Sequence, residues 1–155
     1  RSRGRHRTQQ IHDALMQRCK MEGPMAQQEI EVILIRQLAS YLAMPMVIVN
    51  PVGTLLFYNE PAEALLAMRF EETGELTEDV WVNDLMLTDE HGVPVAPEAR
   101  PLTIALHEQR PAHTTMWGQG RDGVRRHVEV TAFPLIGQAG RVLGAVGLFW
   151  EVKHP

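Results

Sequence analysis

The first clear pattern along the chain is a helical repeat of apolar positions over residues 25–43. Apolar side chains recur there every three or four residues, which predicts an amphipathic helix. Val32 and Ile35 widen the apolar surface beyond one stripe. A monomer seldom leaves so much apolar surface exposed, so we expect one side to cover the chain's own domain and the other a second copy of the helix. The alternative is packing wholly on its own domain. The predicted dimer contacts are Ile30, Ile33, Leu34, Leu38 and Tyr41.

From residue 45 the pattern changes to short apolar runs. Residues 45–50 and 54–58 flank a turn at Pro51-Val52-Gly53, which predicts a hairpin. Asn59 then stands where a helix N-cap is expected, and Pro61 suits the first turn of a helix over residues 62–68.

Residues 69–97 are polar and acidic, and they predict short helical turns and a loop. Within this stretch we expect a set of inward-facing side chains: Leu76, Val80, Trp81, Leu85 and Met86. A further helix is expected up to Gln109, where Leu102, Ala105 and Leu106 share one face.

The last third of the chain predicts three strands, at residues 112–120, 124–136 and 142–152. In the third strand both alternating sets are apolar, as in a strand covered on both faces. Gly144 and Gly147 indicate a close approach to its backbone. The expected class is therefore α+β, with one five-stranded antiparallel sheet, the middle helices on one face and the N-terminal helix on the other.

Charge is spread unevenly over the 155 residues. Residues 1–20 carry six basic and one acidic side chain, a net charge of +5, whereas residues 21–155 carry −9. An acidic body repels a phosphate backbone, so nucleic acid is not an expected partner. No apolar stretch approaches the roughly 20 residues that a membrane helix needs, so no membrane contact is expected. With Cys19 as the single cysteine, no intramolecular disulfide can form, and a cytoplasmic location is expected.

Several of these pieces together resemble the PAS domain family. They are the hairpin with Asn50-Pro-Val-Gly53, Tyr58-Asn59 followed by Leu65-Leu66, the Arg100-Pro-Leu102 helix start, the Arg121-Asp-Gly123 turn, Phe133-Pro-Leu135, and residues 140–147. The family usually has aspartate at the position of Asn50 and glycine at that of Ala67 or Met68. The resemblance implies a PAS-like domain at residues 44–153 behind a flanking dimerisation helix at 25–43 and a basic lead-in at 1–24. It also implies a sensory or interaction role and a cavity between sheet and helices.

Within such a cavity the candidate ligand contacts are a small group of aromatic, methionine and arginine side chains: Tyr58, Trp81, Met86, Arg100 and Trp117. Ordinary core packing is the alternative for Trp81 and Met86. No cofactor is required by the sequence. The resemblance leaves haem or flavin open. The single cysteine that could react with a flavin, Cys19, precedes the domain, and the candidate haem ligand His107 begins a polar run outside the predicted inward face of its helix.

No catalytic or metal-binding residues are predicted. The two serines, Ser2 and Ser40, lie in the lead-in and the first helix, and no histidines or carboxylates have metal-ligand spacing on an apolar face. We therefore expect a non-catalytic module that forms a homodimer and binds a small molecule or a signalling protein to regulate signalling in trans. The alternatives are a haem or flavin redox or gas sensor and, less in keeping with the residues, an enzyme acting on a small metabolite.

Overall fold

The computed structural model describes residues 24–153, so most of the predicted lead-in at 1–24, together with Cys19, lies outside the described residues. The chain divides into two compact units after Leu34, within the first described helix. Within residues 24–153 no helix has the length and apolar content needed to cross a membrane. In chain order the elements are α2 (Pro24–Tyr41), β1 (Met46–Val49), β2 (Leu55–Tyr58), α3 (Glu60–Leu66), α4 (Phe70–Thr73), α5 (Glu78–Leu85), η1 (Pro97–Ala99), α6 (Pro101–Glu108), β3 (Ala112–Gln119), β4 (Arg125–Ile136), η2 (Gln138–Gly140) and β5 (Val142–Glu151).

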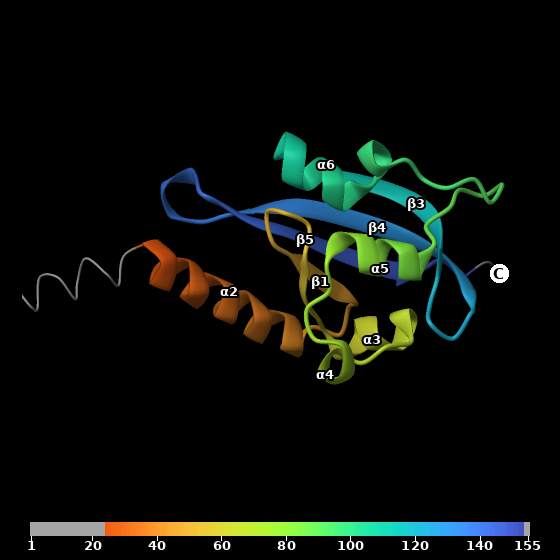
Figure 1. Cartoon of the computed structure of the whole chain (residues 1–155), viewed down its shortest axis with the longest axis horizontal. Helices are drawn as coiled ribbons and strands as arrows, with labels where there is room; N and C mark the ends of the chain where they lie inside the picture. The colour runs from red at the N-terminus through yellow and green to blue at the C-terminus, as the bar shows by residue number, and fades with distance from the viewer. Residues whose placement is uncertain (1–23, 154–155) are drawn as a thin grey trace, which may run out of the picture. The chain divides into compact units, whose positions relative to one another are not determined.

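The five strands form one antiparallel sheet, as predicted, and their order in it is β2-β1-β5-β4-β3 (Figure 1). The hairpin β1–β2 joins the β3–β4–β5 meander because β1 pairs with β5, with Ile48 opposite Val146. This pairing makes β5 the central strand. Its apolar side chains on both faces follow from that position, since both faces are covered.

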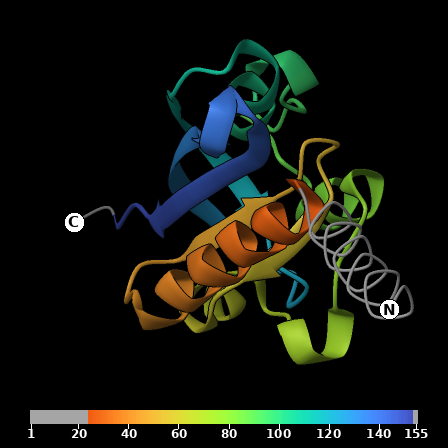
Figure 2. The same ribbon diagram turned by 90° about the vertical axis from the view of Figure 1, so that its left-hand side faces the viewer.

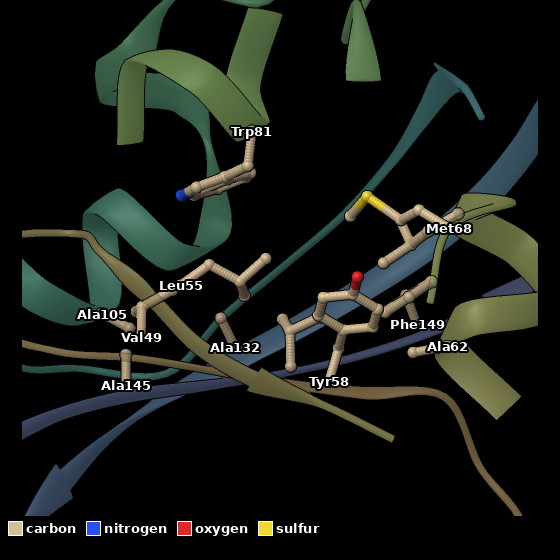
Figure 3. Packing of buried hydrophobic residues seen from close by; sticks show 12 residues of the cluster. Val49, Leu55, Tyr58, Ala62, Met68, Trp81, Ala105, Ala132, Ala145 and Phe149 are labelled. Atoms are coloured by element: carbon tan, nitrogen blue, oxygen red, sulfur yellow. The ribbon is translucent and has the colours of Figure 1, made fainter. Parts of the chain in front are cut away.

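Two hydrophobic clusters lie on opposite faces of the sheet. On one face α3, α5 and α6 contribute Ala62, Trp81 and Ala105 to a cluster with β-strand residues such as Val49 and Phe149 (Figure 3). On the other face the C-terminal turns of α2 pack against the sheet (Figure 2). The second cluster contains Ala39, Met46, Ile48 and Val146, with Ile35 and Leu42 packed against it.

Asn59 is the buried polar centre of the fold, with only 1% of its surface exposed. Its Oδ1 accepts a hydrogen bond from the backbone N–H of Ala62, so the predicted N-cap is confirmed, and a second one from Met46 N–H. Its Nδ2 donates to the carbonyl oxygens of Ala39 and Met44. One amide therefore joins the C-terminal end of α2, the first residue of β1 and the start of α3.

Gly144 and Gly147 occupy the crowded positions that the sequence indicated. A Cβ on Gly147 would lie 3.0 Å from Val47 Cγ2 and 3.3 Å from Leu102 Cδ2. A Cβ on Gly144 would lie 1.9 Å from the carbonyl oxygen of Val49, and the φ of Gly144 is +142°. The predicted close approach at both glycines is confirmed, and at Gly144 the neighbour is backbone.

Two side chains of α5 were expected to face inward and do not. Val80 and Met86 are exposed, Met86 by 59%, whereas Trp81 is buried and Leu85 packs against the core. Trp81 and Leu85 are four residues apart and share one helical face, which Val80 cannot join. Met86 ends the helix in a left-handed conformation with φ 44° and ψ 57°. The inward prediction for Val80 and Met86 is therefore wrong.

Candidate functional site

A cavity of about 110 Å³ lies between the sheet and the helices α3, α5 and α6. In Figure 3, Trp81 projects from α5 on one side of this region, and the strand residues Val49, Leu55 and Ala132 lie on the other. The walls are mostly aliphatic and aromatic. The apolar side chains that line it are Val47, Val49, Leu55, Leu65, Leu66, Met68, Trp81, Leu85, Leu87, Leu102, Leu106, Met116, Val128, Val130 and Phe149.

Trp81 is fixed in position by burial and by a hydrogen bond from its indole N–H. Its indole is 7% exposed, and its Nε1–H donates a hydrogen bond of 2.9 Å to the carbonyl oxygen of Gly53. A buried indole needs such a partner, because its N–H would otherwise be left unpaired. The bond ties α5 to the β1–β2 turn, so the turn and the helix together fix one wall of the cavity.

Arg100 and Arg126 line the cavity, and both guanidinium groups are already hydrogen-bonded. Nε and Nη2 of Arg100 donate to the carbonyl oxygen of Val95, at 3.2 and 3.0 Å. Arg126 forms a two-pronged pair with Asp122, with contacts of 3.1 and 2.7 Å. That pair is the main reason why the pKa of Asp122 falls to about 2, so the carboxylate stays ionised beside Arg126 at neutral pH. The positive charge of Arg126 is therefore neutralised by the adjacent Asp122 carboxylate.

Two of the five predicted ligand contacts, Trp81 and Arg100, line the cavity; the other three, Tyr58, Met86 and Trp117, do not. Met86 is exposed at the end of α5, as described above. The sequence therefore predicts two of the cavity residues correctly, Trp81 and Arg100, but three of the large side chains expected there do not reach the cavity.

Tyr58 lies in the core and not at a cavity mouth. It is 1% exposed, and its hydroxyl makes a 2.7 Å hydrogen bond with Thr73 Oγ1 of α4. Its ring meets Phe70 edge-to-face, with ring centres 5.3 Å apart. Burial raises the pKa of the Tyr58 phenol above its ordinary value. Tyr58 therefore works as a packed link between β2 and α4.

Trp117 lies on the sheet face opposite the cavity. Its strand partner is His127, and the two rings stack with centres 4.8 Å apart, while the Arg125 guanidinium lies 4.9 Å from the centre of the indole. The neighbouring pair, Met116 opposite Val128, points into the cavity instead. Since successive strand residues point to opposite faces, Met116 and Trp117 cannot both line the same cavity.

The sequence analysis missed Met116 and the cavity-facing valines of β4. The signal was present as alternation, because Val128 and Val130 stand between polar neighbours. In β3 the alternation is weaker, since Thr114, Met116 and Gly118 compete with His113, Thr115 and Trp117 as the inward set. The pairing of β3 with β4 decides between them, and pairing is a long-range property.

Helix α2 has two apolar stripes on different sides. The inner stripe, Ile35, Ala39 and Leu42, contributes to the second core cluster. The outer stripe is Ile30, Ile33, Leu34, Leu38 and Tyr41, whose exposed fractions run from 52% to 88%. At 100° per residue the centres of the two stripes are roughly 130° apart around the helix. The five residues predicted as dimer contacts thus lie together on one exposed stripe.

Arg36 lies between these stripes and ties α2 to two further elements. Its Nη2 donates to the carbonyl oxygen of Leu56. Its guanidinium carbon lies 5.4 Å from the ring centre of Phe57 and 5.5 Å from that of Phe70. A cation within about 6 Å of an aromatic ring centre is attracted to that ring, and here two rings in edge-to-face contact share one cation. Arg36 therefore connects α2 with β2 and α4, next to the Phe70 ring that packs on Tyr58.

Among the described residues that line the cavity, none offers the usual axial ligand for haem iron. No histidine or cysteine is among its lining residues, and His107 is exposed on α6. Sites for ligands of the size of haem or flavin are commonly clefts of about 300–1,000 Å³, several times this cavity. Among residues 24–153 no group of three or more His, Cys, Asp or Glu side chains is placed to hold a metal ion.

Comparison with known proteins agrees with this arrangement. A family model described as the PAS fold matches residues 40–154. Similar solved structures include the PAS domain of BvgS from Bordetella pertussis, with 14% identity and a TM-score of 0.56 over 80% of this chain and 87% of that one. The PAS domain of nitrogen regulation protein NR(II) from Vibrio parahaemolyticus has 16% identity and a TM-score of 0.56 over 77% and 98%.

The LOV protein of Rhodobacter sphaeroides is also similar, with 15% identity and a TM-score of 0.61 over 77% of this chain and 66% of that one. A search of curated proteins found no match. At these identities the solved structures support the fold alone, whereas the family model covers most of the sequence. This chain belongs to the PAS-fold family, a family of sensory signalling modules.

Proposed function

We propose that this chain is a non-catalytic sensory module that forms a homodimer through the outer stripe of α2 and binds a small molecule in the cavity. In this proposal the bound state alters the packing of α2 and so regulates a signalling partner in trans, in the cytoplasm. The observation that carries it is the pairing of an apolar cavity with an exposed apolar stripe on a helix anchored to the same domain.

The outer stripe supports a self-association surface. Five apolar side chains at helical spacing along α2 are each more than half exposed, and exposed apolar groups of this kind mark interaction sites. The stripe is a repeat at helical spacing, which suits packing against another helix. A second copy offers a matching surface, because the two partners of a twofold dimer present the same patch to each other.

The contacts of Asn59 and Arg36 support a coupling between cavity and helix. Asn59 fixes the end of α2 to β1 and α3, and Arg36 fixes α2 to β2 and α4. Leu55 of β2 and Leu66 of α3 line the cavity. A ligand that shifts these elements therefore acts on residues that hold α2 directly.

The absence of a catalytic role rests on the chemistry of the lining. Its polar side chains are those of Glu78, Arg100, Thr103, Gln119 and Arg126, with no histidine, cysteine or serine among the cavity residues that the structure describes. A positioned acid–base or nucleophilic pair is the usual requirement for catalysis at such a site.

Replacing Leu34 and Leu38 by glutamate tests the dimer. The wild-type chain, at tens of micromolar, is expected to sediment with twice its 17.5 kDa mass. The double variant is expected to sediment as a monomer, because unpaired buried carboxylates are costly enough to weaken association by about 100-fold or more. Sedimentation equilibrium measures both masses.

The matched control is the pair Val93→Glu and Val124→Glu, which places the same charges on exposed valines outside α2. This control is expected to keep the wild-type mass, and circular dichroism should show all three proteins folded. A wild-type chain that is monomeric at these concentrations, or a Leu34→Glu/Leu38→Glu variant that remains dimeric, removes the dimer from the proposal.

A further inference from the structure

We propose that the cavity takes a compact, uncharged and mainly apolar molecule of about six to nine heavy atoms, such as a single six-membered ring with a neutral substituent. This inference rests on the ligand-binding part of the proposed function and adds the chemical class of the ligand. Three features of the cavity lead to it: its volume, its lining, and the state of its charged groups.

The volume sets the upper size. At about 110 Å³ the cavity is somewhat smaller than an engineered apolar cavity of about 150 Å³ that binds benzene. Fused-ring cofactors and nucleotides exceed this space. A single small ring fits with minor shifts of flexible lining side chains such as Met68 and Met116.

The lining selects against charge. Residues from β1, β2, α3, α5, α6 and β5 present aliphatic or aromatic groups to the cavity, among them Val49, Leu55, Leu66 and Phe149. Moving an ionised group from water into such surroundings costs far more than the small contact area returns. A neutral ligand meets no such penalty.

The charged lining groups do not offset that penalty, and the acidic one among them, Glu78, is exposed to solvent. Arg126 is neutralised by Asp122, and it also donates to the Val124 carbonyl oxygen. Arg100 makes no ion pair with another described residue, but two of its nitrogens already bond to Val95 O. An anion at Arg100 would have to compete with that carbonyl, so Arg100 is the strongest rival site for a charged ligand, and the benzoate comparison below tests for one.

Two neutral polar side chains in the lining allow the ligand to carry one neutral polar substituent. Thr103 and Gln119 line the cavity, and neither side chain hydrogen-bonds another residue that the structure describes. A hydroxyl, nitro or similar neutral group on the ligand can pair with them. This is why the proposed class includes a neutral substituent on the ring.

The test measures thermal unfolding of the wild-type chain with benzene, nitrobenzene and benzoate. Nitrobenzene and benzoate have the same shape and differ in charge. Benzene and nitrobenzene are each expected to raise the unfolding midpoint by about 5 °C at ten times their dissociation constants. Benzoate is expected to bind about 100-fold more weakly than nitrobenzene, because its carboxylate is desolvated.

A matched pair of variants on α6 locates the binding. Leu106 lines the cavity, whereas Ile104 on the same helix does not. Leu106→Phe fills part of the space and is expected to weaken benzene binding at least about tenfold, since overpacked cores resist further volume. Ile104→Phe is expected to leave benzene binding unchanged.

Each outcome bears on the ligand class separately from the dimer. Benzoate binding as tightly as nitrobenzene overturns the neutral class and assigns Arg100 an anion. No midpoint shift with either neutral compound, or equal binding by both α6 variants, also overturns the inference. The mass of the wild-type chain is unaffected by these results, so the dimer of the proposed function stands or fails on its own measurement.

Discussion

Gly144→Ala is expected to destabilise the folded chain by about 4 kcal/mol or more, a large part of the roughly 5–15 kcal/mol that stabilises a typical domain. Two costs add at this position. The φ of +142° is a conformation that residues with a Cβ rarely adopt, and the new Cβ would lie 1.9 Å from the Val49 carbonyl oxygen. That oxygen belongs to a neighbouring strand, so relief of the clash requires β1 and β5 to separate. Urea-induced unfolding followed by circular dichroism measures the effect.

Gly140→Ala is the matched control, since Gly140 has a positive φ of +70° but no atom within 4 Å of the added Cβ. It is expected to cost about 1–2 kcal/mol, the backbone term alone. If Gly144→Ala loses no more stability than Gly140→Ala, the close packing of β1 on β5 at this point is not as described.

Asn59→Ala is expected to destabilise the chain by about 3–5 kcal/mol. The substitution removes four hydrogen bonds at a site that is 1% exposed. It removes the side-chain partner of the Met46 and Ala62 N–H groups and of the Met44 carbonyl oxygen, whereas the Ala39 carbonyl oxygen keeps its hydrogen bond from Leu42 N–H. Buried backbone groups without partners carry the full desolvation cost. Thermal and urea unfolding both measure the loss.

Asn83→Ala serves as the control, because Asn83 is exposed on α5 and is expected to change stability by less than about 0.5 kcal/mol. Asn59→Asp keeps the two acceptor roles but not the two donor roles, so it should be nearly as harmful at neutral pH as Asn59→Ala. A near-wild-type stability for both Asn59 variants would contradict the role of this amide in joining α2 to the sheet.

The role of Asn59 shows how far the sequence alone reaches. Its N-cap position follows from local signals, since Asn59 precedes Pro61 and an apolar helical run. Its donation to Ala39 and Met44 depends on where α2 ends relative to α3, some 15–20 residues away in the chain. Local pattern can therefore predict one of its four side-chain hydrogen bonds, the one from Ala62 N–H, and only the tertiary fold supplies the other three.

The central place of β5 in the sheet was predictable from its own sequence. Both alternating sets of β5 are apolar, which fits only a strand covered on both sides, and its glycines mark close backbone contact. Which strand of the β1–β2 hairpin joins β5 does not follow from this pattern, because either hairpin strand has an open edge, and in the structure it is β1.

The cavity residues were harder to predict because they depend on facing and register. Trp117 and Met116 are adjacent, so a shift of one residue in the β3–β4 register exchanges which of them faces the cavity. Met86 is apolar and follows Leu85, yet the helix ends there and the left-handed backbone turns it to the solvent. Tyr58 has a polar tip that suggested a cavity mouth, but Thr73 satisfies its hydroxyl inside the core.

The exposed stripe of α2 was predictable for a physical reason. An amphipathic helix with one apolar stripe needs one cover, and α2 has apolar side chains on two sides. The structure places the inner stripe on the sheet and leaves the outer stripe exposed. We propose that a second copy of α2 covers the outer stripe, and the proposed sensory function depends on this dimer.

The most direct test of that proposal is the distance between two copies of α2 in solution. A spin label at Ser40→Cys, in a Cys19→Ser background, places one label per chain on an exposed position beside the outer stripe. Helices packed through the stripe bring the two labels within about 30 Å in either orientation, since packed helix axes are about 8–10 Å apart and the stripe is about 17 Å long. Double electron–electron resonance is predicted to show one narrow distance distribution in this range, which Leu34→Glu/Leu38→Glu abolishes. A labelled Ser40→Cys sample with Leu34 and Leu38 intact that shows no dipolar modulation at tens of micromolar, or only longer distances, contradicts the account.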